Sequence, residues 1–119
     1  MGKALVATLG AGRGTWGHVA RVVDGMEWSK VYLITNEFSK DKFKTEKKFE
    51  MIPINIEKPI SEMAEEIKKA LNGRITDLEV ALNIVSGEGR EHMAVISALL
   101  QLGLGIRLVA LTKEGVRVI

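Results

Sequence analysis

The chain contains no cysteine, which excludes a disulfide framework, a thiolate nucleophile and a cysteine-ligated zinc site. Aromatic residues make up only 5% of the sequence, so the core has to be built from aliphatic side chains. The basic excess is small, with 17 Lys and Arg against 15 Asp and Glu, which argues against duplex nucleic acid as a partner. No apolar run approaches the ~18 residues of a membrane helix, so no membrane association is expected.

The composition that is present is typical of one globular domain. The 119 residues are 46% hydrophobic and 27% charged, and this length supports one sizeable core, so a single domain over residues 1–119 is predicted. The N-terminal stretch reaches glycines too soon for a signal peptide, so a cytoplasmic protein is expected. The single glutamine and the lack of cysteine are typical of a thermophile.

Short apolar runs alternate with amphipathic stretches along the chain. Within each run apolar residues follow one another directly, which is typical of strands buried on both faces of a parallel sheet. Pro53 lies inside the third run and favours an edge position for that strand. The expected strands are 4–9, 31–35, 51–56, 78–85 and 106–111, followed by an antiparallel hairpin strand at 116–119.

Helical periodicity marks three of the segments between these runs. One face of 16–23 is apolar, with Thr15 as a candidate N-cap, and a clean apolar stripe runs along 60–71. The stretch 91–102 is apolar almost all round, so a lone chain would expose an aliphatic patch there, and a homodimer is predicted. The lysine-rich stretch 38–49 is either a short helix or a mobile crossover, and it is expected to be either a solvated surface segment or a rim that attracts phosphate.

This alternation predicts a doubly wound, Rossmann-like α/β fold with right-handed crossovers and helices on both faces of the sheet. The expected strand order is 3-2-1-4-5, with the C-terminal strand antiparallel at the edge. The order then reverses between the first and fourth strands, where sheets of this kind bind ligands outside the carboxyl ends of the strands. Those ends are the two most glycine-rich loops, 10–17 and 86–90.

The first of these loops has the composition of a phosphate-binding turn. Gly12 and Gly14 are expected where the backbone approaches a ligand or adopts a positive φ, and the helix start that follows offers N–H groups. Trp16 either stacks a base at the pocket mouth or packs at the start of the helix. Gly12, Gly14 and Gly17 also match G-x-G-x-x-G, with Glu37 near a ribose-binding position. An NAD- or FAD-binding module of an oxidoreductase-like protein is therefore the alternative.

The second loop offers groups for a phosphate or a ribose. Ser86 and the loop amides are expected to bind the ligand, and Arg90 to neutralise phosphate charge. Glu91 is expected to favour the helix start, and His92 to be exposed on its first turn. No metal or cofactor is expected, because the two histidines lie in different loops without a carboxylate at ligand spacing. The candidate ligand-binding residues are Gly10, Gly12, Arg13, Gly14, Thr15, Trp16, Asn36, Ser86, Gly87, Glu88, Gly89 and Arg90.

With both loops in place, the chain resembles the CRISPR-associated Rossmann-fold (CARF) domain family over nearly its whole length. That family often carries Ser-Gly-Gly-Thr-Lys-x-Met after its fourth strand, where this chain reads Ser-Gly-Glu-Gly-Arg-Glu-His-Met over 86–93. An alanine- and leucine-rich helix and a strand at 105–109 follow in the same order. Arg90 stands where the family has lysine, the threonine is missing, and Met93 comes one residue late.

The resemblance implies a dimer that binds a cyclic oligoadenylate second messenger across its two-fold axis, as a sensor or sink in CRISPR antiviral signalling. It implies a stand-alone member, since no effector domain accompanies the CARF-like part. Some stand-alone relatives are metal-independent ring nucleases that use a hydroxyl residue of the first loop and a lysine of the second. The matching positions are Thr15 and Arg90, the candidate catalytic residues. Arginine is a poor proton donor, so the resemblance leaves the enzyme class open.

Overall fold

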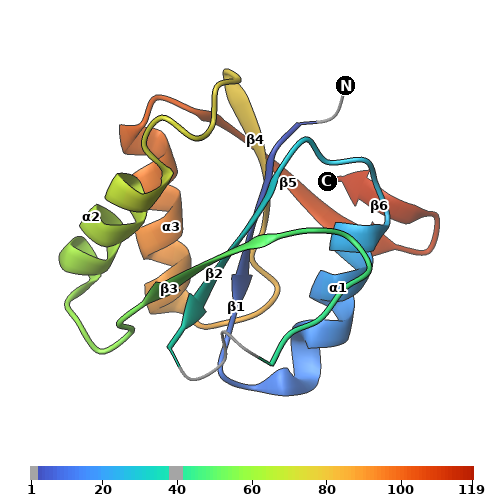
Figure 1. The fold of residues 1–119 in the computed structure, drawn as a ribbon, viewed down its shortest axis with the longest axis horizontal. Helices are drawn as coiled ribbons and strands as arrows, with labels where there is room; N and C mark the ends of the chain where they lie inside the picture. Colours follow the sequence, from blue (N-terminus) through green and yellow to red (C-terminus); the bar gives the residue numbers. More distant parts are fainter. Residues whose placement is uncertain (1–2, 38–41) are drawn as a thin grey trace.

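Within residues 3–37 and 42–119, which the structure describes, six strands form one sheet through the middle of the molecule (Figure 1). The strands are β1 (Leu5–Leu9), β2 (Val31–Asn36), β3 (Glu50–Ile54), β4 (Glu79–Asn83), β5 (Gly105–Thr112) and β6 (Gly115–Val118). Their order in this computed structural model is β3-β2-β1-β4-β5-β6. All neighbours are parallel except β5 and β6, which are antiparallel. The predicted doubly wound α/β fold and its strand order are confirmed.

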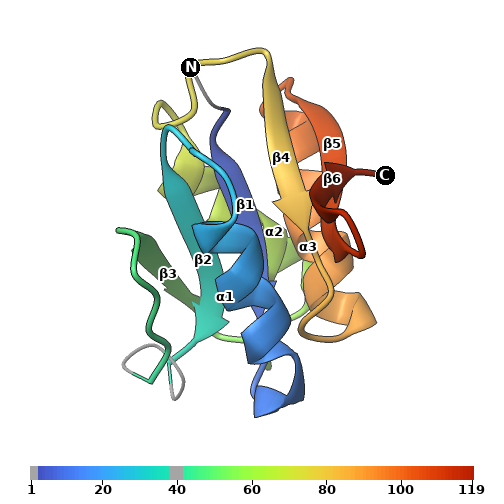
Figure 2. The ribbon, with the colours of Figure 1, turned by 90° about the vertical axis from the view of Figure 1, so that its right-hand side faces the viewer.

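Helices cover both faces of the sheet, as the pattern predicts. α2 (Ile60–Leu71) and α3 (Gly89–Gln101) lie on one face, and α1 (Trp16–Asp24) lies on the other (Figures 1 and 2). A short 3₁₀ turn, η1 (Arg13–Thr15), leads from β1 into α1. Successive strand residues point to opposite faces, so Val6 belongs to the core under α2 and α3 while Leu5 belongs to the core under α1.

Aromatic side chains cover the part of the α1 face that lies beside β2 and β3. Phe43 is 5% exposed, and its ring packs edge-on against Trp16 and Phe49 with centroid separations of 6.0 and 5.6 Å. Residues 42–49 contain no helix, and 38–41 lie outside the described residues, so the described part of the lysine-rich stretch is an irregular crossover. The few aromatic residues are thus concentrated where this crossover supplies no helix to bury the sheet.

Glycine and proline mark several boundaries where the sequence predicts them. Pro53 lies in β3, an edge strand, where a missing backbone N–H is tolerated. Gly115 has φ of 100° and introduces β6, and Gly73 has φ of 81° just after α2. Thr15 precedes α1 as predicted, but the prediction that its side chain caps the helix is wrong. The residue is itself in helical conformation at the end of η1, and its side chain makes no cap hydrogen bond.

Candidate functional site

Ser86 joins the two glycine-rich loops at the carboxyl ends of β1 and β4. It is 1% exposed, and its Oγ accepts the Gly10 N–H at 2.8 Å. Its carbonyl oxygen accepts hydrogen bonds from the Thr8 hydroxyl and from His92 Nε2. Ser86, expected to bind ligand, therefore lies beneath the loops and holds them together. His92 is half-buried by this contact, so its expected exposure is wrong.

Gly10 approaches Gly87 so closely that the first loop has no room for a side chain at this position. A Cβ on Gly10 would lie 2.7 Å from both Cα and N of Gly87, well inside contact distance. Gly87 also has φ of 93°, a conformation that favours glycine. These two glycines form the floor on which the loops meet.

A hollow of about 350 Å³ opens above this floor, between the start of η1 and the start of α3. Both loops line it, so the two carboxyl ends identified in the sequence do form one site. Four of its residues were not among the candidates: Ala11, Ile56, Val85 and Glu91. Ile56 reaches the hollow from the connection between β3 and α2, which no local pattern reveals. The lining residues are Gly10, Ala11, Gly12, Gly14, Thr15, Ile56, Val85, Gly87, Glu88 and Glu91.

The second-loop side of the hollow is acidic. Glu88 and Glu91 form a capping box, in which the side chain of each residue accepts a hydrogen bond from the backbone N–H of the other. The distance from Glu88 N to Glu91 Oε2 is 3.3 Å. This confirms that Glu91 favours the helix start. Because these carboxylates already occupy donors at the start of α3 and carry negative charge, this side disfavours a phosphate.

The first-loop side has the opposite character. No acidic residue lies in the first turn of η1 or of α1, and within the described chain no side chain caps either start. Backbone N–H groups at such uncapped starts attract anions. The hollow therefore has a donor side formed by residues 11–15 and an acceptor side formed by Glu88 and Glu91.

Arg13 and Trp16 lie beside the hollow without lining it. The Trp16 indole N–H donates to the Gly10 carbonyl at 2.9 Å, and its ring packs against Phe43. The exposed Arg13 guanidinium lies 5.4 Å from the centroid of the Trp16 ring. These contacts favour the packing interpretation of Trp16 over base stacking.

Three further candidates do not line the hollow. Arg90 donates from its two terminal nitrogens to the carbonyls of Ile56 at 2.7 Å and Lys58 at 2.6 Å, which ties the start of α3 to the connection between β3 and α2. Gly89 is the first residue of α3. Asn36 is 4% exposed at the end of β2.

The G-x-G-x-x-G match at Gly12, Gly14 and Gly17 lacks the close packing of helix on strand that this motif provides in dinucleotide-binding folds. Its third glycine normally allows a helix to pack closely on a strand. A Cβ on Gly17 would meet no described atom within 4 Å, so the packing of α1 does not require glycine there. Glu37 follows β2 and does not line the hollow.

No protein-family profile matches this chain, and no curated protein matches it. Its class is therefore set by fold and site: a Rossmann-like α/β protein with a hollow where the strand order reverses. Across 3–37 and 42–119, no helix is long and apolar enough to cross a membrane. Those residues also contain no cluster of three His, Asp or Glu side chains able to hold a metal ion.

Proposed function

We propose that this protein is a nucleotide-binding module whose ligand occupies the hollow between β1 and β4, and that the ligand is a cyclic oligoadenylate. The position of the hollow carries the proposal: it lies at the carboxyl ends of parallel strands where the order reverses, and both loops line it. The resemblance of residues 86–93 to the CARF signature supports the ligand class.

The two sides of the hollow favour one ligand orientation. A phosphate is attracted to the uncapped backbone of residues 12–15, where no carboxylate opposes it. Ribose hydroxyls and the adenine amino group are hydrogen-bond donors, and the carboxylates of Glu88 and Glu91 accept such bonds. Phosphate on the first loop and sugar or base on the second is therefore the proposed arrangement.

The size of the hollow favours a ligand shared between two copies. About 350 Å³ lies at the lower end of the range for small-molecule pockets, so one hollow holds roughly one nucleotide. A cyclic oligoadenylate has several nucleotides, and a second copy of the chain has to hold the others. Packing of two α3 helices about a two-fold axis parallel to them places both hollows on the same side of the dimer.

Binding is proposed here in preference to ring cleavage. Thr15, one of the two candidate catalytic residues, lines the hollow. The terminal nitrogens of Arg90, the other candidate, already donate to the Ile56 and Lys58 carbonyls. The geometry thus brings one hydroxyl to the site and uses the arginine elsewhere.

Calorimetry with cyclic tetra- and hexa-adenylate, with and without EDTA, tests the proposal. Gly14→Val places a branched side chain in the hollow, and Gly17→Val is the matched control outside it; a Cβ at either position meets no described atom within 4 Å. We expect binding with intact rings, weakened about tenfold or more by Gly14→Val and little changed by Gly17→Val. Absence of binding, or equal effects of the two substitutions, would refute the site.

A further inference from the structure

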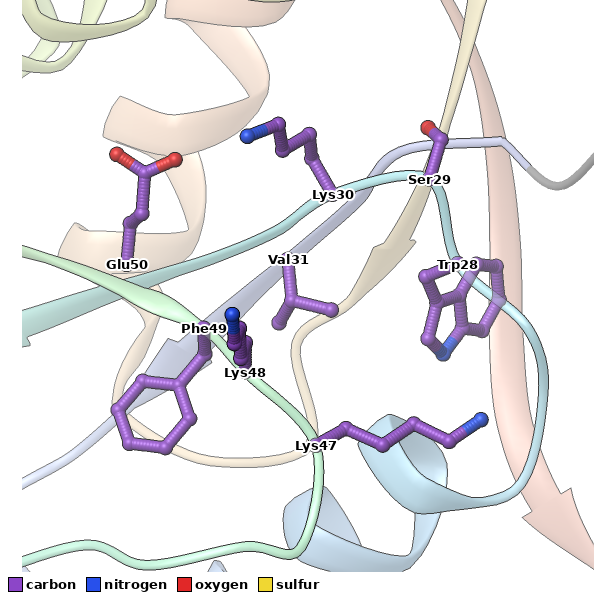
Figure 3. A pocket seen from close by; sticks show the side chains of 8 residues that line it. All are labelled: Trp28, Ser29, Lys30, Val31, Lys47, Lys48, Phe49 and Glu50. Carbon is purple, nitrogen blue, oxygen red and sulfur yellow. The ribbon is translucent and has the colours of Figure 1, made fainter.

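A second hollow lies at the opposite end of the sheet, outside the amino ends of β2 and β3. Its volume is about 770 Å³, large enough for a nucleotide or a somewhat larger ligand. No residue is shared with the hollow between β1 and β4. Its lining residues, shown as sticks in Figure 3, are Trp28, Ser29, Lys30, Val31, Lys47, Lys48, Phe49 and Glu50.

Most of these residues come before the point where β2 and β3 begin to pair through hydrogen bonds. The first paired residues of the two strands are Tyr32 and Glu50, so 28–31 and 47–49 enter the sheet without pairing to each other. Neighbouring residues of an extended segment point to opposite faces. Val31 and Phe49 point to the α1 face, so Lys30, Lys48 and Glu50 beside them point to the other face. Lys47 differs from these charged residues, because its side chain bonds to the Met26 carbonyl and to Glu27, just after α1.

The apolar part of the hollow is held rigidly in place. Trp28, Val31 and Phe49 all belong to the core under α1, and Figure 3 shows the two rings on either side of Val31. The Trp28 indole N–H donates to the Val22 carbonyl at 2.9 Å, and Phe49 packs edge-on against Phe43. Both rings are half-buried, so each keeps some exposed surface that a flat ligand ring can cover.

The charges around the hollow leave two lysines without a counter-charge. Glu50 pairs with Arg74 at 3.2 Å, and Lys47 is held by Glu27 at 3.1 Å and by a backbone carbonyl. Lys30 and Lys48 are exposed, and within residues 3–37 and 42–119 the ammonium group of neither makes a hydrogen bond or an ion pair. The hollow therefore combines a rigid apolar wall with two unneutralised cations.

We infer that this hollow binds a nucleotide unit, with the base against Trp28, Val31 and Phe49 and the phosphate near Lys30 and Lys48. A flat ring next to an anion is the chemistry that this combination recognises, because aromatic side chains stack bases and lysines attract phosphates. A free mononucleotide and the end of a single strand present the same unit. The inference is independent of the ligand proposed for the other hollow.

Fluorescence of Trp28 tests this inference directly. Trp16, the other tryptophan, is replaced in a Trp16→Phe background, and the protein is titrated with AMP and with an adenosine hexaribonucleotide. We expect Trp28 quenching by both. Lys30→Ser/Lys48→Ser should raise both dissociation constants about tenfold. It should also reduce the slope of log binding constant against log salt concentration for the hexamer by about 1.4, because each of the two lost phosphate contacts contributes ~0.7.

Lys69→Ser/Lys113→Ser is the matched control, since it removes the same charge from exposed sites outside the hollow. Failure of both ligands to quench Trp28, or equal weakening by the two double lysine substitutions, would overturn the inference. Quenching by AMP alone assigns a free nucleotide, whereas much tighter hexamer binding assigns a single strand. Quenching that persists in Gly14→Val belongs to this hollow, so its outcome is separate from that of the proposed function.

Discussion

At the scale of single residues, the glycines of the first loop differ in what requires them. Gly10 is needed because it touches the backbone of Gly87, whereas a Cβ on Gly12 or Gly14 meets no described atom within 4 Å. Gly12 has φ of −80°, and neither it nor Gly14, both within the described chain, has a positive φ. The positive-φ alternative for these two glycines is therefore wrong, and only ligand approach would require glycine there.

Alanine substitutions separate these requirements. Gly10→Ala should destabilise the protein by roughly 1–3 kcal/mol, because its Cβ would force two backbone segments apart. Gly12→Ala should be neutral or stabilising by about 0.4–1 kcal/mol, because it restricts the unfolded chain without straining the fold. Urea unfolding of both variants measures the difference, and equal stabilities would contradict the close contact of Gly10 with Gly87.

The two histidines hold different parts of the fold together. His18 Nε2 lies 3.3 Å from the Leu111 backbone N–H and 3.3 Å from the Asn83 amide nitrogen, so it accepts from both. His92 Nε2 lies 2.9 Å from the Ser86 carbonyl, so it donates. His18 thus connects α1 to β4 and β5, and His92 connects α3 to the second loop.

These contacts require opposite tautomers when both rings are neutral. His18 should carry its proton on Nδ1 and His92 on Nε2, because a backbone N–H needs an acceptor and a carbonyl needs a donor. Long-range ¹H–¹⁵N correlation spectra at neutral pH distinguish the two forms by the nitrogen shifts. The same tautomer in both residues would show that one of these contacts does not form.

At the scale of elements, Arg90 fastens α3 to the connection between β3 and α2. Arg90→Ala should cost about 1–3 kcal/mol, because it removes two charge-assisted hydrogen bonds to backbone carbonyls. The amides of Glu57 and Lys58, which bond to Asn55, should exchange faster with solvent. Hydrogen exchange measures this, with Arg74→Ala as the control. Unchanged exchange together with weaker ligand binding would restore the ligand role predicted from sequence.

An ion-paired glutamate connects the amino ends of three strands. Glu79 in β4 receives hydrogen bonds from Lys3 at 2.8 Å and from Arg107 in β5 at 3.0 Å, and both hold the pKa of its carboxyl below the ordinary value of 4.5. A lowered folded-state pKa stabilises the protein above the unfolded-state value. That contribution is lost as pH falls through the folded-state value.

Glu79→Gln should therefore be less stable than the parent protein at neutral pH, and the two should converge in acid. Because the site is open to solvent, the difference should be small and should shrink with added salt. Denaturant unfolding from pH 7 down to pH 3 follows the convergence. A stability difference that stays constant over this range would mean that the ion pairs contribute nothing.

At the scale of the whole molecule, α3 leaves an apolar strip uncovered. Ala94, Val95, Ala98 and Leu99 are buried, but Met93 and Leu100 are 63% and 61% exposed. They flank a shallow surface hollow together with Ile96, so the aliphatic patch expected of a lone chain is present.

We expect this strip to form a homodimer interface. Light scattering at micromolar concentration should give twice the chain mass, and Met93→Lys/Leu100→Lys should give the monomer. Leu78→Lys, at a residue that is 86% exposed and lies before β4, is the control and should leave the dimer intact. A monomeric parent protein would contradict the shared-ligand arrangement.

The sequence by itself determined the strand order, the edge position of β3 and the C-terminal hairpin. These features depend on hydrophobic period, chain connectivity and the conformational limits of residues such as Pro53 and Gly115, all of which are local. The convergence of the two glycine-rich loops followed from the same topology. The spacing of hydrophobic residues along the sequence also shows which face of a helix is apolar, as in α3.

Only the tertiary structure decided what the polar side chains near the site do. Ser86 and Arg90 have the same residue types that a ligand site needs, but each bonds to backbone that folding brings close. Trp16 and His92 are likewise used in packing and loop contacts. A polar group bonds to whichever partner folding leaves within about 3 Å, and that choice depends on the positions of distant segments, which local pattern does not contain.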